Sequence, residues 1–255
     1  MKLSQSDEKL SGYCPDRKRR IESLGKVKRT FILFIGVEFV DQIRFEFRII
    51  PVKLKSFFAK KKEVSKDIKF LNIGCNDTPI SKEWLNLDLF GGEGVISHDC
   101  RFPLPFADEQ FEGIFSEHFL EHLEYTYEAL NLVREVYRML KRGGVFRVVV
   151  PDCGAYFKAY VNGGMAAVNE LRGTIDGKDP WFDVSCNTPM ELLNIVMRQG
   201  AEHKFCYDEE TLKSLLKSLG FKEVKVVPNN LSAIEELMVD RQDRVSESLR
   251  VEGVK

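Results

Sequence analysis

The stretch Phe70-Leu71-Asn72-Ile73-Gly74-Cys75-Asn76 decides the fold of this 255-residue chain, because an apolar run leads directly into a glycine turn. The first four residues have the length and composition of a buried strand. Glycine accepts a left-handed backbone and lets a ligand approach closely, and asparagine is among the few other residues that tolerate a positive φ. We therefore predict a strand that ends at a binding site.

Further strands and helices follow this turn. Apolar segments predict strands at Trp84–Leu89, Val95–Asp99, Phe111–Ser116, Val145–Val150, Lys222–Val227 and Leu249–Val254. Apolar residues at three- and four-residue spacing predict a helix from Ala129 to Leu140 that ends at Gly143-Gly144. Asp208 is a predicted N-cap of a helix that ends at Gly220.

This alternation predicts an α/β fold, a Rossmann-like, seven-stranded, mostly parallel sheet with flanking helices. Only 14 residues separate Gly74 from Asp88, and fewer separate Asp88 from Asp99. We therefore expect the first two crossovers to be shortened.

Charge divides the chain into parts, although the net charge is only −1. Residues 1–69 hold 18 Lys and Arg against 9 Asp and Glu, a charge of +9, which leaves −10 for the remainder. We predict a flexible basic arm over 1–30, an apolar and basic extension over 31–68, and a body over 69–255 in which 153–200 forms a lid or acceptor insertion.

The extension has two interpretations. Within 31–58, Ile43, Phe45, Phe47 and Ile49 alternate with charged residues as in a strand, whereas Pro51 is suited to open a short helix. We expect the extension to pack on the body, because short crossovers leave sheet surface uncovered. The alternative is contact with a membrane surface through the basic N-terminal part.

Cysteine usage and charge exclude several classes of protein. None of the six cysteines forms a C-x-x-C pair, and no secretory signal is evident, which favours free thiols in the cytoplasm, with peripheral membrane contact as the alternative. The acidic body does not indicate a nucleic-acid partner. The oligomeric state is left open.

Polar side chains follow four of the predicted strands, at the edge where open parallel sheets bind ligands. Asp88 could accept hydrogen bonds from the two hydroxyls of a ribose, and Asp99 from an exocyclic amine. Ser116-Glu117-His118 follows the fourth strand. Together with the glycine turn, these groups outline a site shaped for adenosine.

Five blocks within residues 69–152 resemble the class I S-adenosylmethionine (SAM)-dependent methyltransferases, in particular the small bacterial-type enzymes of the methyltransferase type 11-like family. The blocks are Leu71–Cys75, Trp84–Asp88, Leu104–Asp108 with Phe111, Ser116–His122 and Met139–Gly144. The resemblance implies SAM as cofactor and methyl transfer to a small-molecule or glycan acceptor, such as a cell-envelope intermediate. It implies that the cofactor is bound by Asn72, Gly74, Cys75, Asn76, Asp88, Leu89, Asp99, Cys100, Ser116 and Glu117.

Within that set, the resemblance assigns the methionine end of SAM to the Gly74 turn and the ribose to Asp88. Asp99 and the backbone of Cys100 would bind the adenine, and Ser116-Glu117 the methionine amino group. Two positions depart from the family pattern: Asn72 replaces its first acidic residue and Asn76 its second glycine. These departures motivate the alternative of a non-catalytic SAM-binding or scaffold protein. A nicotinamide-dependent oxidoreductase is less favoured, because the three-glycine pattern is absent.

Methyl transfer from a sulfonium mainly requires alignment of the reacting atoms, and an acceptor hydroxyl would also need a base. His118 is the favoured candidate, ahead of Glu117, Asp152 and His203. His118-x-x-Glu121-His122 also matches an inverted zinc-protease motif. No third ligand is evident in the sequence, so we predict no metal site.

Overall fold

The computed structural model describes residues 37–255 except 77, 81–82, 175–177 and 183, so the predicted arm 1–30 lies outside the described residues. Seven strands form one sheet in the order β3-β2-β1-β4-β5-β7-β6. Strands β1 to β5 pair in parallel, and β7 is antiparallel to β5 and β6. The bounds are β1 Phe70–Ile73, β2 Trp84–Asp88, β3 Val95–Ser97, β4 Phe111–Glu117, β5 Leu140–Pro151, β6 Lys222–Val226 and β7 Ser248–Val254. The predicted fold class is confirmed.

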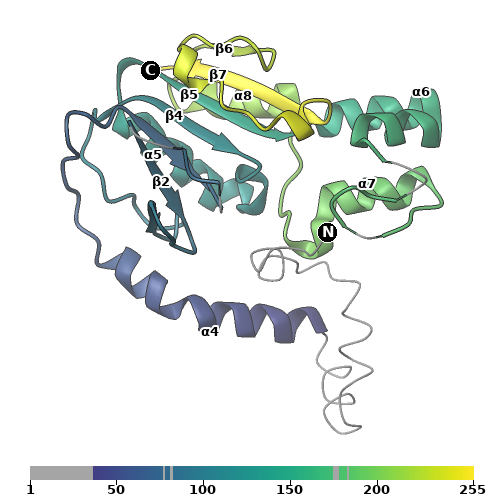
Figure 1. Ribbon diagram of the computed structural model, residues 1–255, viewed down its shortest axis with the longest axis horizontal. Helices are drawn as coiled ribbons and strands as arrows, with labels where there is room; N and C mark the ends of the chain where they lie inside the picture. Colours follow the sequence, from purple (N-terminus) through teal and green to yellow (C-terminus); the bar gives the residue numbers. More distant parts are fainter. Residues whose placement is uncertain (1–36, 77, 81–82, 175–177, 183) are drawn as a thin grey trace, which may run out of the picture.

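Helices cover the sheet unevenly. Between β1 and β4 the described residues contain no helix, so the crossovers there are short, as predicted. Helices α5 (Leu130–Met139) and α8 (Glu209–Ser218) cover one face and share its main core with strand residues such as Ile114 and Val148. Helices α6 (Cys153–Arg172) and α7 (Pro189–Arg198) form a second core beside the sheet (Figure 1). Short helical turns complete the chain: η1 Leu120–His122, η2 Tyr125–Ala129, η3 Gln199–Ala201, η4 Glu235–Leu237 and η5 Gln242–Arg244.

The opposite face of the sheet is covered by the segment between β6 and β7. Leu237 packs there against Phe70 and Phe115. Arg147 of β5 lies on the same face, is fully buried, and donates hydrogen bonds to Asp240 and Glu252. A guanidinium in the middle of a sheet is tolerated because its charge is neutralised at close range.

One local prediction was wrong, and one ambiguity in the sequence is resolved. Helix α5 ends at Met139, before Gly143-Gly144, because Leu140 is already extended and begins β5. Gly143, with φ of 78°, instead makes a turn inside that strand. The segment with strand-like alternation forms a helix, α4 (Val37–Phe57), which contains Pro51.

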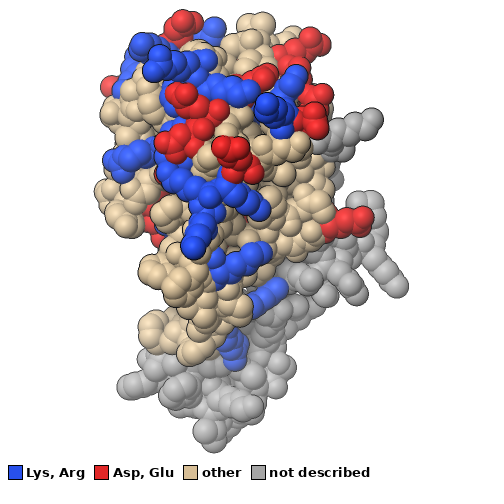
Figure 2. All heavy atoms as spheres, turned by 90° about the vertical axis from the view of Figure 1, so that its left-hand side faces the viewer, with Lys and Arg blue, Asp and Glu red and all other residues tan. Residues whose placement is uncertain are grey.

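Helix α4 lies beyond the ends of β2 and β3 (Figure 1). Ile49 and Ser56 are buried, and the Phe45 ring meets the Phe90 ring edge-on at 6.3 Å. The other side of the helix is apolar and exposed. The view in Figure 2 shows basic and acidic side chains intermixed on the upper body, whereas the lower part is largely uncharged with scattered Lys and Arg. Every helix in the described part of the chain is too short or too polar to cross a membrane.

Candidate cofactor and acceptor site

The turn after β1 has the strained backbone that the sequence predicted. Gly74 has φ of 77° and Asn76 has φ of 49°. The Gly74 N–H donates to the Leu87 carbonyl at 2.8 Å, which holds the turn against β2. A Cβ at position 74 would lie 2.4 Å from the Phe119 ring. Phe119 thus packs against the turn so closely that only glycine fits at position 74.

Asp88 ties the first two strand ends together. Its Oδ2 accepts from the Asn76 N–H at 2.9 Å and its Oδ1 from the Phe90 N–H at 3.1 Å. Burial outweighs these hydrogen bonds and raises the pKa of Asp88 above its ordinary value. Leu89 follows in a partly buried position. Each carboxylate oxygen has further lone pairs, so the pair of acceptors that a ribose needs is available here.

Asp99, in contrast, already has a charged partner. It is buried, and its two oxygens accept hydrogen bonds from the Arg101 guanidinium at 2.6–3.1 Å. Burial opposes ionisation, but the bonds from Arg101 lower the pKa of Asp99. Its N–H donates to Ser56 Oγ of α4 at 2.9 Å. Cys100 is buried nearby, and burial together with the charges of Asp88 and Asp99 raises the pKa of its thiol. These neighbours place Asp88 and Asp99 on the same side of the molecule.

Asn72, which replaces the family's acidic residue, forms a hydrogen bond between two strands of the sheet. Asn72 is buried, and its Nδ2 donates to Asn86 Oδ1 on β2 at 3.2 Å. Asn86 also exchanges hydrogen bonds with the Ile80 backbone, at 2.9 and 2.7 Å. Asn72 thus helps to anchor the segment between β1 and β2.

Ser116 and Glu117 end β4 beside the glycine turn, since Ser116 lies opposite Ile73 in the parallel register. Ser116 is 1% exposed, and its Oγ has no hydrogen-bond partner among the described residues. Glu117 accepts from the Arg241 N–H at 3.0 Å, and burial raises the pKa of its carboxyl. A buried hydroxyl without a partner is costly, so this end of β4 is suited to bind a polar ligand.

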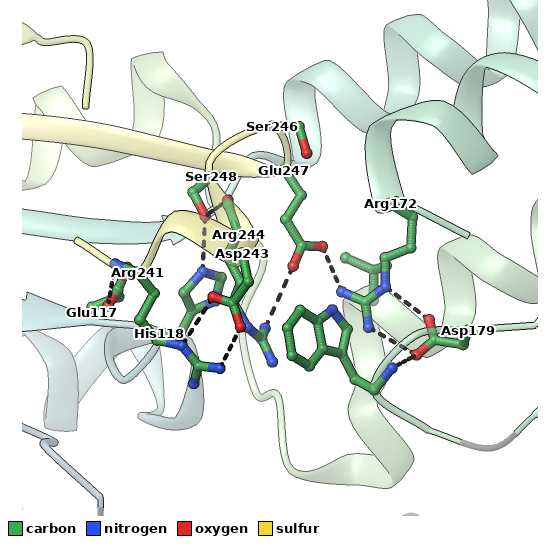
Figure 3. A network of polar contacts seen from close by, with 12 residues as sticks. Glu117, His118, Arg172, Asp179, Arg241, Asp243, Arg244, Ser246, Glu247 and Ser248 are labelled. Carbon is green, nitrogen blue, oxygen red and sulfur yellow. Dashed lines mark hydrogen bonds and ion pairs between the residues drawn. The ribbon is translucent and has the colours of Figure 1, made fainter. Parts of the chain in front are cut away.

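Both ring nitrogens of His118 have neighbours, and Figure 3 shows one of them, Ser248. Ser248 donates its only hydroxyl proton to the Arg244 carbonyl at 2.7 Å, so its oxygen accepts from His118 Nε2 at 2.9 Å. His118 Nδ1 lies 3.3 Å from Glu121 Oε1. His118 is therefore held in one orientation, and its role as a base stays a prediction. Asp152, an alternative base, caps α6 by accepting from the Ala155 N–H.

An arginine-rich wall adjoins His118, and sequence reasoning missed it. The Arg244 guanidinium lies 4.3 Å from the Trp181 ring centre and that of Arg241 lies 5.5 Å from it. Arg172 joins the insertion to the last loop through ion pairs with Asp179 and Glu247 (Figure 3). No local motif marks these arginines, because the wall is assembled from segments at least 60 residues apart.

The structure also adds a third residue to the Glu121-His122 pair. His203 arrives from the segment after α7, and its Nε2 lies 4.0 Å from Glu121 Oε1. The surrounding histidines outweigh burial and lower the pKa of Glu121 to about 2, whereas burial lowers the pKa of His203 to about 4. A buried carboxylate is thus surrounded by imidazoles.

Comparison with known proteins agrees with this geometry. Residues 71–148 match the family model described as methyltransferase domain. No curated protein matches the chain.

Three solved structures illustrate the similarity. A SAM-dependent methyltransferase from Archaeoglobus fulgidus is 17% identical, with 91% of this chain and all of that one covered and a TM-score of 0.41. A SAM-dependent methyltransferase, possible histamine N-methyltransferase, from Thermotoga maritima is 14% identical, with 86% and 97% covered and a TM-score of 0.41. Phosphoethanolamine N-methyltransferase 2 from Haemonchus contortus, in complex with SAM, is 14% identical with a TM-score of 0.42, and the match covers 82% of this chain but only about half (52%) of that one.

The family match spans β1 to β5, the strands that bring the glycine turn, Asp88 and Ser116 to one edge of the sheet. The sequence blocks, the strand order and the turn geometry therefore all indicate the same ligand edge of the sheet. Residues 71–148 thus match a methyltransferase domain, and they lie in the Rossmann-like sheet that the sequence predicted.

Proposed function

We propose that SAM binds along the ends of β1, β2 and β4 and that its methyl group passes to an anionic glycan or another anionic cell-envelope intermediate. The observation that carries the cofactor position is the bond from the Asn76 N–H to Asp88 Oδ2, which joins the glycine turn to the ribose-binding carboxylate. SAM supplies an activated methyl group on a sulfonium. The chain's own residues orient it, since alignment is the main contribution of such a site.

In this arrangement the Gly74 turn faces the methionine end, and Asp88 accepts from the ribose hydroxyls. Ser116 Oγ, buried and without a partner among the described residues, gains a ligand hydrogen bond. Because Arg101 occupies the oxygens of Asp99, contact with adenine falls mainly to the backbone of Cys100.

The acceptor side of the proposal rests on the arginine-rich wall. Arg241 and Arg244 lie over Trp181, next to Glu117 and His118. Arg244 is partly buried, and its Nε has no hydrogen-bond partner among the described residues. Guanidinium groups bind carboxylates and phosphates in forked pairs, so an acidic or phosphorylated sugar suits this wall better than a neutral one.

Calorimetry tests the cofactor position. Asp88→Ala should abolish measurable binding of SAM and of its demethylated product, whereas Asp67→Ala, at an exposed site, should bind both as the wild type does. Equal binding by the two variants would contradict the proposal. Binding without turnover on any acceptor would instead favour the scaffold alternative.

Transfer of a labelled methyl group tests the acceptor. With labelled SAM and a bacterial cell-envelope extract, the label should appear in the fraction retained by an anion exchanger. Arg244→Gln should lower that labelling without changing SAM affinity, and Arg142→Gln, whose side chain is 92% exposed, should not. Label only in the unretained fraction would contradict an anionic acceptor.

We further propose that α4 contacts an anionic membrane surface. Phe39, Phe47 and Leu54 are each more than half exposed, and their spacing places them on one side of the helix. Basic residues, including Arg48 and Lys55, flank this side. An apolar stripe bordered by cations is typical of helices that lie in the membrane interface.

Co-sedimentation with vesicles tests this contact. The full chain should sediment with phosphatidylcholine vesicles that contain phosphatidylglycerol and much less with phosphatidylcholine alone. The double variant Phe47→Ser with Leu54→Ser should lose sedimentation, and Val161→Ser, an exposed apolar position on α6, should retain it. Unchanged sedimentation of the double variant would contradict the proposal.

A further inference from the structure

Three potential metal ligands converge behind the end of β4. Glu121 and His122 belong to the turn η1 (Leu120–His122), and His203 lies in the segment before α8. Their ligand atoms all lie within 4.8 Å of one another. The rings of His122 and His203 meet edge-on with centres 4.8 Å apart. Two segments, with His203 lying 81 residues after His122, thus bring two imidazoles and a carboxylate together.

The carboxylate of Glu121 lacks the hydrogen bonds that its burial requires. Its side chain is 2% exposed, and neither oxygen has a hydrogen-bond partner among the described residues. The nearest basic atoms are His118 Nδ1 at 3.3 Å and His203 Nε2 at 4.0 Å. A buried carboxylate normally accepts several hydrogen bonds or coordinates a metal. Apart from the ion-pair contact with His118, this carboxylate therefore has lone pairs that are available to a ligand.

His203 is held in the tautomer that a metal ligand needs. Its Nδ1 lies 2.7 Å from the carbonyl of Val196, so this nitrogen carries the proton and donates it. Nε2, the nitrogen nearer Glu121, is then left with its lone pair. Histidines that bind metals commonly donate their other ring nitrogen to a carbonyl or carboxylate in this way.

The backbone fixes the two segments against each other. The N–H groups of Lys204 and Phe205 both donate to the carbonyl of Glu121, at 2.8 and 3.3 Å. The position of His203 relative to Glu121 is therefore set before any ligand binds. Preformed ligand spacing of this kind favours metal affinity, because less ordering is needed on binding.

We infer that Glu121, His122 and His203 bind a divalent transition metal, with zinc as the best match. Two imidazoles and a carboxylate are one of the sets that hold zinc with a fourth position open. Ligands at roughly 2.0–2.1 Å from a tetrahedral zinc lie about 3.3 Å apart, so the ligand atoms need to close by up to about 1.5 Å. Side-chain rotation of the partly buried His122 can supply most of this change.

Metal titration of the full chain tests the inference. After dialysis against a chelator, the protein should bind one equivalent of Zn²⁺ or Co²⁺, and bound Co²⁺ should show the visible absorption of a four- or five-coordinate ion. Glu121→Gln and His122→Gln should each weaken Zn²⁺ binding by roughly tenfold or more. His98→Gln is the matched control, because His98 is a buried histidine that contacts the Pro103 carbonyl outside this cluster.

Three results would overturn the inference: no stoichiometric metal, equal affinity in Glu121→Gln and His98→Gln, or a Co²⁺ spectrum dominated by thiolate charge transfer, which would place the ion on cysteines. Circular dichroism of each variant separates lost binding from lost folding. SAM calorimetry on the same samples distinguishes this inference from the proposed function, because cofactor binding at the strand ends does not require the metal.

Discussion

Arg147 and Ser116 lie on neighbouring strands, one register position apart, and are both buried polar residues with opposite surroundings. Every nitrogen of the Arg147 guanidinium donates to Asp240, to Glu252 or to a backbone carbonyl. Ser116 Oγ has no partner among the described residues. Arg147 lies on the face covered by the β6–β7 segment, and Ser116 lies at the ligand edge. Arg147 is thus fully paired within the fold, whereas Ser116 leaves a buried hydroxyl that a ligand could pair.

The largest expected effect on stability comes from removing Arg147 from its cluster with Asp240 and Glu252. Arg147→Met should lower the free energy of unfolding by about 3–5 kcal/mol, because two buried carboxylates lose their counter-charge. Urea denaturation measures the loss. Arg142→Met, at a position with a 92% exposed side chain, should stay within about 0.5 kcal/mol of the wild type. Similar urea midpoints for the two variants would contradict the proposal that the Arg147 cluster stabilises the fold.

A second test separates backbone strain from close packing at the ligand edge. Gly74 and Gly94 share a φ above 70°, but a Cβ at 94 meets nothing within 4 Å. Gly94→Ala should cost about 1–2 kcal/mol from the left-handed backbone alone. Gly74→Ala should cost about 1–3 kcal/mol more, because the methyl group collides with Phe119, and should also weaken SAM binding. Equal losses of unfolding free energy in Gly74→Ala and Gly94→Ala would show that the protein relieves the contact with Phe119 without a further loss of stability.

A third test uses pH. Asp99→Asn should destabilise the protein by about 1–2 kcal/mol at pH 7, because a charged hydrogen-bond acceptor of Arg101 is lost. The folded-state pKa of Asp99 is lowered from 3.8, so its stabilisation is present above that pH and disappears as the pH falls through the folded-state pKa. Denaturation at pH 7 and near pH 3 should show the difference from wild type shrinking with acid. A difference that grows in acid would contradict the assigned ion pair.

The smallest expected effect on stability comes from Ser116→Ala. Removing a hydroxyl that has no partner should change the free energy of unfolding by less than about 0.5 kcal/mol, yet weaken SAM binding by about 3- to 10-fold, the value of one hydrogen bond. Ser218→Ala should lower the free energy of unfolding and leave SAM affinity unchanged. Its Oγ donates to the Leu215 carbonyl at 2.7 Å, away from the site. Unchanged SAM affinity in Ser116→Ala would mean that the orphaned hydroxyl does not serve the ligand.

The strands and the ligand edge could be predicted from the sequence because their signals are local. An apolar run followed by glycine, or by an acidic residue, reports both a strand and its end. The helix α4 could not be recognised in this way. Ile43, Phe45, Phe47 and Ile49 alternate as in a strand, and only the burial of Ile49 and Ser56 against the loops after β2 and β3 shows which residues face inward.

The contacts that involve long sequence separations were also beyond local reasoning. The partners of Arg147 lie 93 and 105 residues further along, because β7 inserts between β5 and β6. His203 likewise reaches Glu121 only through the packing of the segment after α7. A charged residue in an otherwise apolar strand is the one hint that a distant carboxylate must exist.

The triad of Arg147, Asp240 and Glu252 also constrains how this protein can evolve. Replacing Arg147 deprives two buried carboxylates of their shared partner, and replacing either carboxylate leaves buried guanidinium donors unpaired, so most one-step routes away from the triad pass through a poorly folded ancestor. Lineages should therefore inherit the three positions as a unit or exchange them together for apolar residues. In an alignment of descendants, these three columns should covary more strongly than any pair on the solvent-exposed surface.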